Sequence, residues 1–243
     1  LNSIDIVLAE DTRHSKKLLK HLNIAKPIRA FHEHNEREKT KASINELHSG
    51  KSIALISDAG TPLISDPGVS LVKEVKKENF ETIAIPGPCA AITALVCSGL
   101  SSSKFIFYGF IPKSGKERNQ IINTIKNSSF TSIIYESPKR ILKLLSDLKD
   151  SCGEDRRISI SKELTKKYEK SILYKIKDAL VYFSKIKPIG EFTIVIGPYD
   201  ENKEKNEEQQ EINFLKEELI ELIKAGLSHS SASNYLAKKH KKP

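Results

Sequence analysis

Residues Ile56–Gly68 read ISDAGTPLISDPG, and the rest of the sequence is best understood from this stretch. The apolar run Ile53–Ile56 leads into it, and the amphipathic run Val69–Val75 follows it. This order predicts a strand, a loop and then a helix. The loop is longer than the few residues that a plain connector needs. Two interpretations are therefore open: an ordinary turn, or a ligand site at the carboxyl end of a strand, where open α/β sheets bind ligands.

The composition of the loop favours the ligand site. Gly60 and Gly68 leave the backbone open to close approach by a ligand. Pro67 fixes its own φ and is suited to open the next helix. Asp58 and Asp66 supply carboxylates that accept hydrogen bonds from hydroxyl or amino groups. We therefore interpret the stretch as part of a small-molecule site.

Short apolar runs alternate with helical patterns along most of the sequence. This alternation predicts an α/β fold built on parallel sheets. The expected strands are 5–9, 28–31, 52–56, 82–85, 105–108, 131–135, 157–161, 171–174 and 192–196. The expected helices are 14–22, one ending before 50, one ending near 77, 90–98, 116–126, 139–148, 178–184, 212–224 and a last one after 228.

Changes in composition predict four parts. We expect an N-terminal α/β domain over residues 1–108 and a C-terminal α/β domain over 109–199. Residues 200–211 are highly charged and predict a linker with nothing to bury. Residues 212–243 predict a helical tail that resembles a small helix-turn-helix, with Ser228 as a helix cap. Because the sequence starts at Leu1, has no methionine and stops soon after its last helix, we expect that it is cut at both ends.

The charge and cysteine content narrow the class of protein. The formal net charge is +9, from 40 Lys and Arg against 31 Asp and Glu, which favours a polyanionic partner such as nucleic acid. A lysine-rich proteome is the alternative explanation. No apolar run approaches the ~20 residues that cross a bilayer, so we expect no membrane association. Cys89, Cys97 and Cys152 are too scattered for a disulfide framework. Cys89 and Cys97 are expected to be buried free thiols, which suits a cytoplasmic protein.

Four polar clusters stand at expected strand ends: 10–13, 56–68, 86–91 and 136–140. The carboxyl ends of parallel strands converge on one edge, so the clusters can share a cleft. None of them carries a dinucleotide or P-loop glycine pattern. His32 and His34 alternate near two glutamates, but no further ligands are spaced around them. A solvated loop is therefore favoured over a metal site, and no metal is expected.

Seven motifs in these and neighbouring regions resemble one known family. They are EDTRHSKKLL at 10–19, ISDAGTPLISDPG at 56–68, IPGPCAAITAL at 85–95, FYGFIP at 107–112, YESPKRI at 135–141, SKELTKKYE at 161–169 and GEFTIVI at 190–196. In this order they are similar to the methyltransferases of small-subunit ribosomal RNA within the tetrapyrrole methylase superfamily. The resemblance runs from about Leu8 to Ile196 and extends to the helical tail.

The resemblance implies a two-domain methyltransferase, commonly a homodimer, that binds S-adenosylmethionine in a cleft between its domains. It implies methyl transfer to a ribose 2′-hydroxyl of a cytidine in small-subunit (16S) ribosomal RNA. Carried over to this sequence, the cofactor-binding residues are Asp58, Ala59, Gly60, Thr61, Ser65, Asp66, Gly68, Gly87, Pro88, Cys89, Ala90, Leu164, Gly190 and Thr193. There are two departures. The family's first strand and glycine-containing loop are not found, and Cys89 stands where the family usually has serine.

A ribose hydroxyl attacks well only as its proton leaves, so a nearby base is expected. The candidate catalytic residues are Glu10, Asp11, Lys162 and Glu163. We favour Glu10 and Asp11 as base or orienting pair. Arg13, Lys139 and Arg140 are the candidates for binding RNA phosphates. A structural ion pair between Glu10 and Arg13 is the alternative.

Two other functions stay open at this point. One is methyl transfer to a tetrapyrrole or another small acceptor. The other is a non-catalytic role in ribosome assembly.

Overall fold

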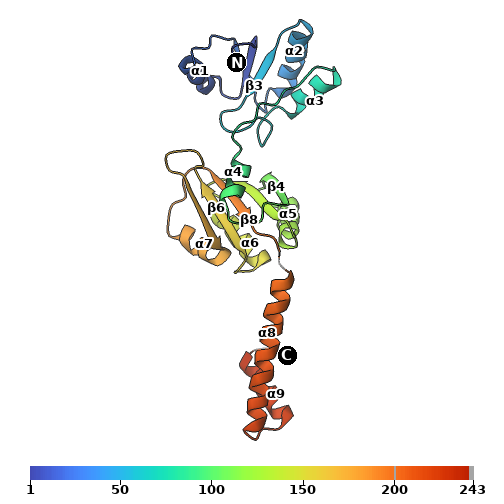
Figure 1. Ribbon diagram of the computed structural model, residues 1–243, viewed down its shortest axis with the longest axis vertical. Helices are drawn as coiled ribbons and strands as arrows, with labels where there is room; N and C mark the ends of the chain where they lie inside the picture. Colours follow the sequence, from blue (N-terminus) through green and yellow to red (C-terminus); the bar gives the residue numbers. More distant parts are fainter. Residues whose placement is uncertain (200, 241–243) are drawn as a thin grey trace. The chain divides into compact units, whose positions relative to one another are not determined.

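The computed structural model describes residues 1–199 and 201–240 (Figure 1). Contacts between Cα atoms divide the chain into two compact units, Leu1–Gly197 and Pro198–Pro243. The first unit contains two sheets. In chain order the elements are β1 (Ile6–Ala9), α1 (Thr12–His21), β2 (Ile28–Ala30), α2 (Glu36–His48), β3 (Ile53–Ile56), α3 (Val69–Lys77), α4 (Ala90–Cys97), β4 (Phe105–Phe110), α5 (Lys116–Lys126), β5 (Thr131–Glu136), α6 (Ile141–Cys152), β6 (Arg157–Lys162), β7 (Lys170–Lys175), α7 (Ile176–Ser184), β8 (Phe192–Ile196), α8 (Glu201–Lys224) and α9 (His229–His240).

The first sheet has the strand order β2-β1-β3 and is parallel throughout. All four residues of β1 are buried, as expected for a central strand covered on both faces. Helix α1 lies on one side of the sheet, and α2 and α3 lie together on the other (Figure 1). The core on the side of α2 and α3 is built by Ile6, Leu8, Phe31, Leu71 and Val75. The strand, loop and helix predicted around Ile56–Gly68 are confirmed as β3 and α3.

The strand expected at residues 82–85 is wrong. These residues have no regular secondary structure, and no described strand forms a ladder with them. The side chains of Ile83 and Ile85 are 72% and 80% exposed. An apolar run becomes a strand only where a neighbour satisfies its backbone groups. The sequence pattern reports the apolar run but not that neighbour.

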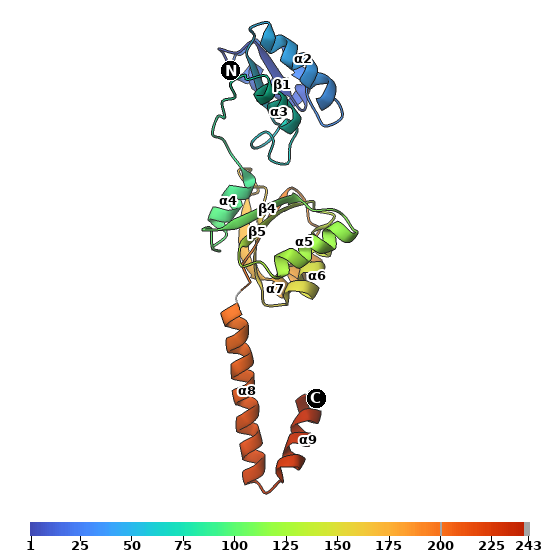
Figure 2. The same ribbon diagram turned by 90° about the vertical axis from the view of Figure 1, so that its right-hand side faces the viewer.

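The second sheet has the order β4-β5-β8-β6-β7. Only β4 and β5 pair in parallel, and the other three pairings are antiparallel, so the expectation of parallel sheets holds for the first sheet but not for this one. Alternate residues of β8 face opposite sides: Ile194 and Ile196 pack against α5, α6 and α7, whereas Val195 packs against α4. Figure 2 shows α4 on one face of this sheet and α5 to α7 on the other.

Helix α4 precedes the second sheet in sequence but packs on it. Its buried residues are Ala91, Ala94 and Leu95, which contact the sheet at Ile133 and Val195. Cys97 lies off this face and is exposed, and Cys89 is half-buried, so the expectation that both thiols are buried is wrong for Cys97 and holds only in part for Cys89. The cysteines are free thiols among the described residues.

The expected division into four parts stays a prediction, although β4 runs across its first boundary at Tyr108. In the second unit, α8 starts at Glu201, so residues 201–211 of the expected linker are helical, while residue 200 lies outside the described residues. Ser228 accepts a hydrogen bond from Ser231 N at 3.2 Å, which confirms the predicted cap. Ala232 and Leu236 are the buried residues of α9. No helix in the described residues is long and apolar enough to span a bilayer.

Candidate active site

The carboxyl ends of β1 and β3 bring two predicted clusters together. Ala9 and Ile56 are partners in the parallel ladder, so the residues that follow each strand start side by side. Asp11 N donates to Asp58 Oδ1 at 3.3 Å. Asp11 is also the N-cap of α1, and its side chain accepts from Arg13 N at 2.8 Å. The sequence thus places three carboxylates, Glu10, Asp11 and Asp58, at one edge of the sheet.

The loop that follows β3 has a constrained backbone. Leu63 and Ser65 have φ of 71° and 64°, in the left-handed region that non-glycine residues rarely adopt. The Ser57 hydroxyl donates to the carbonyls of Ala59 and Gly60 at 3.3 and 3.1 Å. Gly68 has φ of 133°, which favours glycine, and a Cβ there would lie 2.6 Å from a methyl carbon of Leu55, so a larger residue would strain the backbone and displace a leucine side chain.

Three hydrogen bonds fasten this loop and the start of the next helix to their surroundings. At its far end, Glu36 Oε1 accepts from Gly68 N at 3.2 Å and from Ser70 N at 3.0 Å, which ties the start of α3 to α2. In its first half, Thr61 Oγ1 donates to Pro88 O at 2.8 Å. The structure therefore brings the predicted cluster at 86–91, with Gly87, Pro88, Cys89 and Ala90, against the Asp58–Gly68 loop.

Tyr135, at the end of β5, joins this group from the second sheet. Its hydroxyl accepts a hydrogen bond from Ala91 N at 3.0 Å, which satisfies a backbone donor in the first turn of α4. Burial, with a smaller effect from Cys89, raises the pKa of Tyr135 to about 12. The neighbouring β4 also approaches the loop: a Cβ at Gly109 would lie 3.0 Å from Ser65 Oγ. Tyr135 was not predicted as a site residue, because a tyrosine at the end of an apolar strand is typical of a core.

Asp66 has the most perturbed carboxyl of the group. Burial raises its pKa, and the nearby charges of Glu10 and then Asp58 raise it further, against the effect of the Ser57 hydroxyl, to about 6. Asp11 shows the opposite behaviour: hydrogen bonds from the Arg13 side chain lower its pKa to about 2. The edge is therefore rich in negative charge and short of positive partners. Among the described residues, His14 is within ion-pair distance of Asp58, with its Nδ1 4.0 Å from Asp58 Oδ1.

The residues predicted in the second half of the chain lie in two places. Leu164 packs in one apolar cluster with Cys89, Phe107 and Tyr135, so it does meet the first-half residues. Thr193, 5% exposed, is the ladder partner of Tyr135 in β8. Lys162 ends β6 and pairs in the ladder with Phe192.

The carboxylate of Glu163 is held by hydrogen bonds within the protein. Its Oε1 accepts from Glu191 N at 2.9 Å and from Lys166 Nζ at 3.1 Å, and these contacts lower its pKa. Its carboxylate also fills the space beside Gly190, where a Cβ would lie 2.7 Å from it. Glu163 thus holds the turn before β8.

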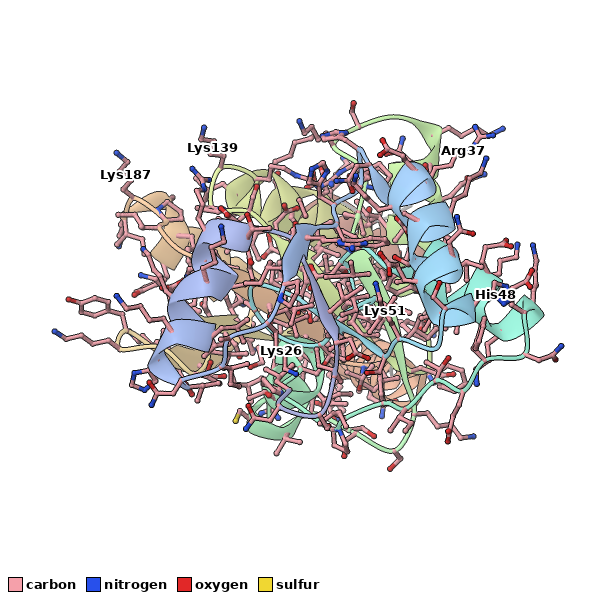
Figure 3. All side chains as sticks on the ribbon, turned by 90° about the horizontal axis from the view of Figure 1, so that it is seen from above. Lys26, Arg37, His48, Lys51, Lys139 and Lys187 are labelled. Carbon is pink, nitrogen blue, oxygen red and sulfur yellow. The ribbon has the colours of Figure 1, made fainter. Side chains whose placement is uncertain are left out.

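The three predicted phosphate ligands differ in exposure. The Arg13 side chain is 87% exposed and pairs with Asp11 at 2.9 Å, not with Glu10, so the alternative Glu10–Arg13 pair is not formed. Lys139 is exposed (Figure 3). Arg140 points inward, because Nε lies 3.0 Å from Glu136 Oε1 and the guanidinium donates to the Ile111 carbonyl. Among the described residues, no group of three or more metal-ligating side chains gathers, and His32 and His34 have rings 6.0 Å apart.

Comparison with known proteins identifies the family. Residues 1–180 match the family described as tetrapyrrole (corrin/porphyrin) methylases. The chain belongs to the tetrapyrrole methylase family. It is therefore a methyltransferase, and its methyl donor is S-adenosylmethionine.

Its relatives include proteins named ribosomal RNA small subunit methyltransferase I. The protein from Synechocystis sp. is 40% identical over 244 residues, which cover 100% of this chain and 86% of the relative. The protein from Haemophilus influenzae is 40% identical over 236 residues, covering 96% of this chain and 82% of the relative. Among solved structures, a cobalt precorrin-4 methyltransferase has a TM-score of 0.59 at 15% identity, covering 81% of this chain and 85% of its own. That likeness confirms the fold.

Proposed function

We propose that this chain transfers a methyl group from S-adenosylmethionine to the 2′-hydroxyl of a cytidine in small-subunit (16S) ribosomal RNA. The observation that carries the proposal is the 40% identity, over the whole chain, to a protein named ribosomal RNA small subunit methyltransferase I. The net charge of +9 supports a polyanionic substrate.

The charge at the edge of the first sheet fits the donor. S-adenosylmethionine carries positive charge on its sulfonium and amino groups, and Asp58 and Asp66 offer carboxylates that can attract it, with His14 at 4.0 Å from Asp58. Gly60 and Gly87 are exposed and leave room for a ligand beside their backbone, and the apolar cluster with Cys89 and Leu164 suits a base ring. When bound, the donor supplies an activated methyl group, so the protein mainly has to position the acceptor oxygen.

Within the candidate pair, we assign the proton-accepting role to Glu10. Asp11 has a pKa of about 2 and is held by Arg13, which makes it a weak base and an orienting residue. Glu163 is engaged by Glu191 N and Lys166. The side chain of Glu10 has no hydrogen bond or ion pair with other described residues, and it stands next to Asp66. Arg13 and Lys139 are exposed and suited to bind phosphates; Arg140 would have to give up its contacts first.

We further assign a homodimer acting in the cytoplasm. Support comes from the outer face of α4, where Ile92 and Val96 are 45% and 75% exposed, with exposed Phe105 and Phe110 nearby in the sequence. Sedimentation of the full-length protein tests the dimer, and a monomer at micromolar concentration contradicts it.

The function is tested by incubating the protein with labelled S-adenosylmethionine and small subunits that lack the modification. We expect label in the RNA at one cytidine, resistant to alkaline cleavage on its 3′ side as a 2′-O-methyl group is. Glu10→Gln should reduce turnover by about 10²-fold or more with unchanged donor binding. Glu33→Gln, at an exposed position, is the matched control. Label in a tetrapyrrole precursor but not in RNA, or none in either, would refute the proposal.

A further inference from the structure

A depression of about 460 Å³ lies beside α1, away from the carboxylate edge. Its lining includes three lysines, Lys16, Lys20 and Lys26, here called the rim, and two apolar residues, Leu19 and Ile28, here called the floor. Leu19 is 2% exposed, so the floor is part of the folded core. A depression of this volume is large enough for a small organic group such as a nucleobase.

The walls of the depression are fixed by backbone contacts. Helix α1 ends in a turn in which Ile24 N donates to Leu19 O at 2.9 Å and Asn23 takes φ of 54°. The segment that leads into β2 is fastened to the sheet, because Val7 N donates to Pro27 O at 2.9 Å. The three lysines therefore project from a rigid frame.

The lysines of the rim have no ion pair with any described residue. Lys26 interacts electrostatically with the carboxylate of Asp5, which also interacts with Lys51 and accepts hydrogen bonds from Ser52 N and Oγ, each at 2.8 Å. Lys26 and Lys51 precede β2 and β3, so both belong to the amino-terminal edge of the first sheet, and both are seen there in Figure 3. No carboxylate lines the depression.

Helix α1 connects this depression to the candidate active site. It begins next to Asp11 and Asp58, and its sequence TRHSKKLLKH contains no acidic residue. Lys16 and Lys20 are one turn apart and share a face. At 1.5 Å per residue, Lys20 lies about 12 Å along the helix axis from Thr12. An extended strand that leaves the active site along α1 therefore reaches the depression within a few nucleotides.

The charges decide how RNA can lie on this protein. The carboxyl edge of the sheet repels phosphates, whereas α1 and the amino edge attract them. We infer that the depression beside α1 binds an unpaired nucleotide of the RNA substrate close to the methylated residue, with Lys16, Lys20 and Lys26 on the phosphates and the base against the apolar floor. This inference rests on the proposed function, since it extends the same RNA from the site where it reacts. An acidic peptide would pair with the lysines, but it has no base ring to place against Leu19 and Ile28.

The test uses the full-length protein and a fluorescein-labelled single-stranded oligocytidine, with binding followed by anisotropy. The variant Lys16→Gln/Lys20→Gln/Lys26→Gln should lose about tenfold or more in affinity near 0.1 M salt, and the slope of log K against log salt should shrink by about 2. The matched control is Lys41→Gln/Lys73→Gln/Lys76→Gln, which removes the same charge from exposed positions on α2 and α3. Equal losses in the two triple variants would overturn the inference.

A second variant tests whether the depression binds the base itself. Ala25→Leu narrows the depression without changing its charge. It should weaken oligocytidine binding several-fold and leave binding of inorganic polyphosphate, which has no bases, unchanged. If Ala25→Leu has no effect, or if oligoglutamate competes as well as oligocytidine, the surface is not a nucleotide site and the inference fails.

Methyl transfer separates this inference from the proposed function. The lysine triple variant should raise KM for small subunits and leave donor binding unaltered. If the wild-type protein does not methylate small subunits, the proposed function fails. If it does, and the triple variant matches it in KM and RNA affinity, only the depression is wrongly assigned.

Discussion

Donor binding should depend on pH through Asp66. Burial and the neighbouring carboxylates raise its pKa from an ordinary 3.8 to about 6 in the free protein. A positively charged donor favours the ionised carboxylate, so binding requires loss of this proton when the pH is below about 6. Affinity is therefore full above pH 7 and falls as the pH drops through 6.

The magnitude follows from one linked proton. Between pH 7 and pH 5 the ionised fraction of a group with a pKa of 6 falls from about nine tenths to about one tenth, so Kd should rise about tenfold, or about 1.4 kcal/mol. Isothermal titration calorimetry with S-adenosylmethionine at pH 5, 6 and 7 measures this. Asp66→Asn should bind more weakly at pH 7 and show a flat profile.

Two control variants isolate the responsible group. Asp11 has a pKa of about 2 and stays ionised throughout, so Asp11→Asn should keep the tenfold slope. His14 Nδ1 lies 4.0 Å from Asp58 Oδ1, so His14→Gln tests whether a basic group beside the site carries the pH dependence; because Asp66 carries it, this variant should also keep the slope. A flat wild-type profile, or a slope that survives in Asp66→Asn and disappears in His14→Gln, refutes the reasoning.

Three further predictions concern stability, each measured by urea unfolding. Both Gly68 and Gly50 have a positive φ, but only at Gly68 would an alanine Cβ also clash with its neighbours. Gly68→Ala should therefore lower the free energy of unfolding by about 1–3 kcal/mol more than Gly50→Ala does. Equal losses would contradict the packing described. Tyr135→Phe removes the acceptor for the first turn of α4 and should cost about 1 kcal/mol, and a neutral result would show that water replaces it. Asp147→Asn weakens the partner of a buried arginine and should cost about 2–4 kcal/mol, whereas Asp150→Asn at an exposed position of the same helix should cost less than about 0.5.

The sequence predicted the bounds of an element well where a clear apolar or amphipathic run marks them along the chain. Helix α5, Lys116–Lys126, and strand β8, Phe192–Ile196, have the bounds that periodicity gave them. The pattern failed at residues 82–85, because a strand depends on a neighbour that the pattern does not show. It also took residues 201–211 for a linker, since a charged helix has no apolar face that periodicity can detect.

In the candidate site, too, contacts between residues far apart in the sequence were only partly predictable. The clusters after β1 and β3 were predicted to meet because parallel strands end on one edge, and Asp11 and Asp58 do form a hydrogen bond. Tyr135 was missed because its role depends on Ala91, 44 positions away. The inward orientation of Arg140 was equally hidden, since its partner Ile111 O is a backbone atom that any residue could supply.

The left-handed residues in the loop after β3 have a kinetic consequence. Conformations such as those of Leu63 and Ser65 cost about 1–2 kcal/mol each, and hydrogen bonds within the protein, from the Ser57 and Thr61 hydroxyls and to the Glu36 carboxylate, hold the loop in them. The donor therefore binds a preformed surface, and no binding free energy is lost to ordering the loop. Association should follow a single exponential whose rate grows linearly with donor concentration, without the plateau that a slow rearrangement would impose.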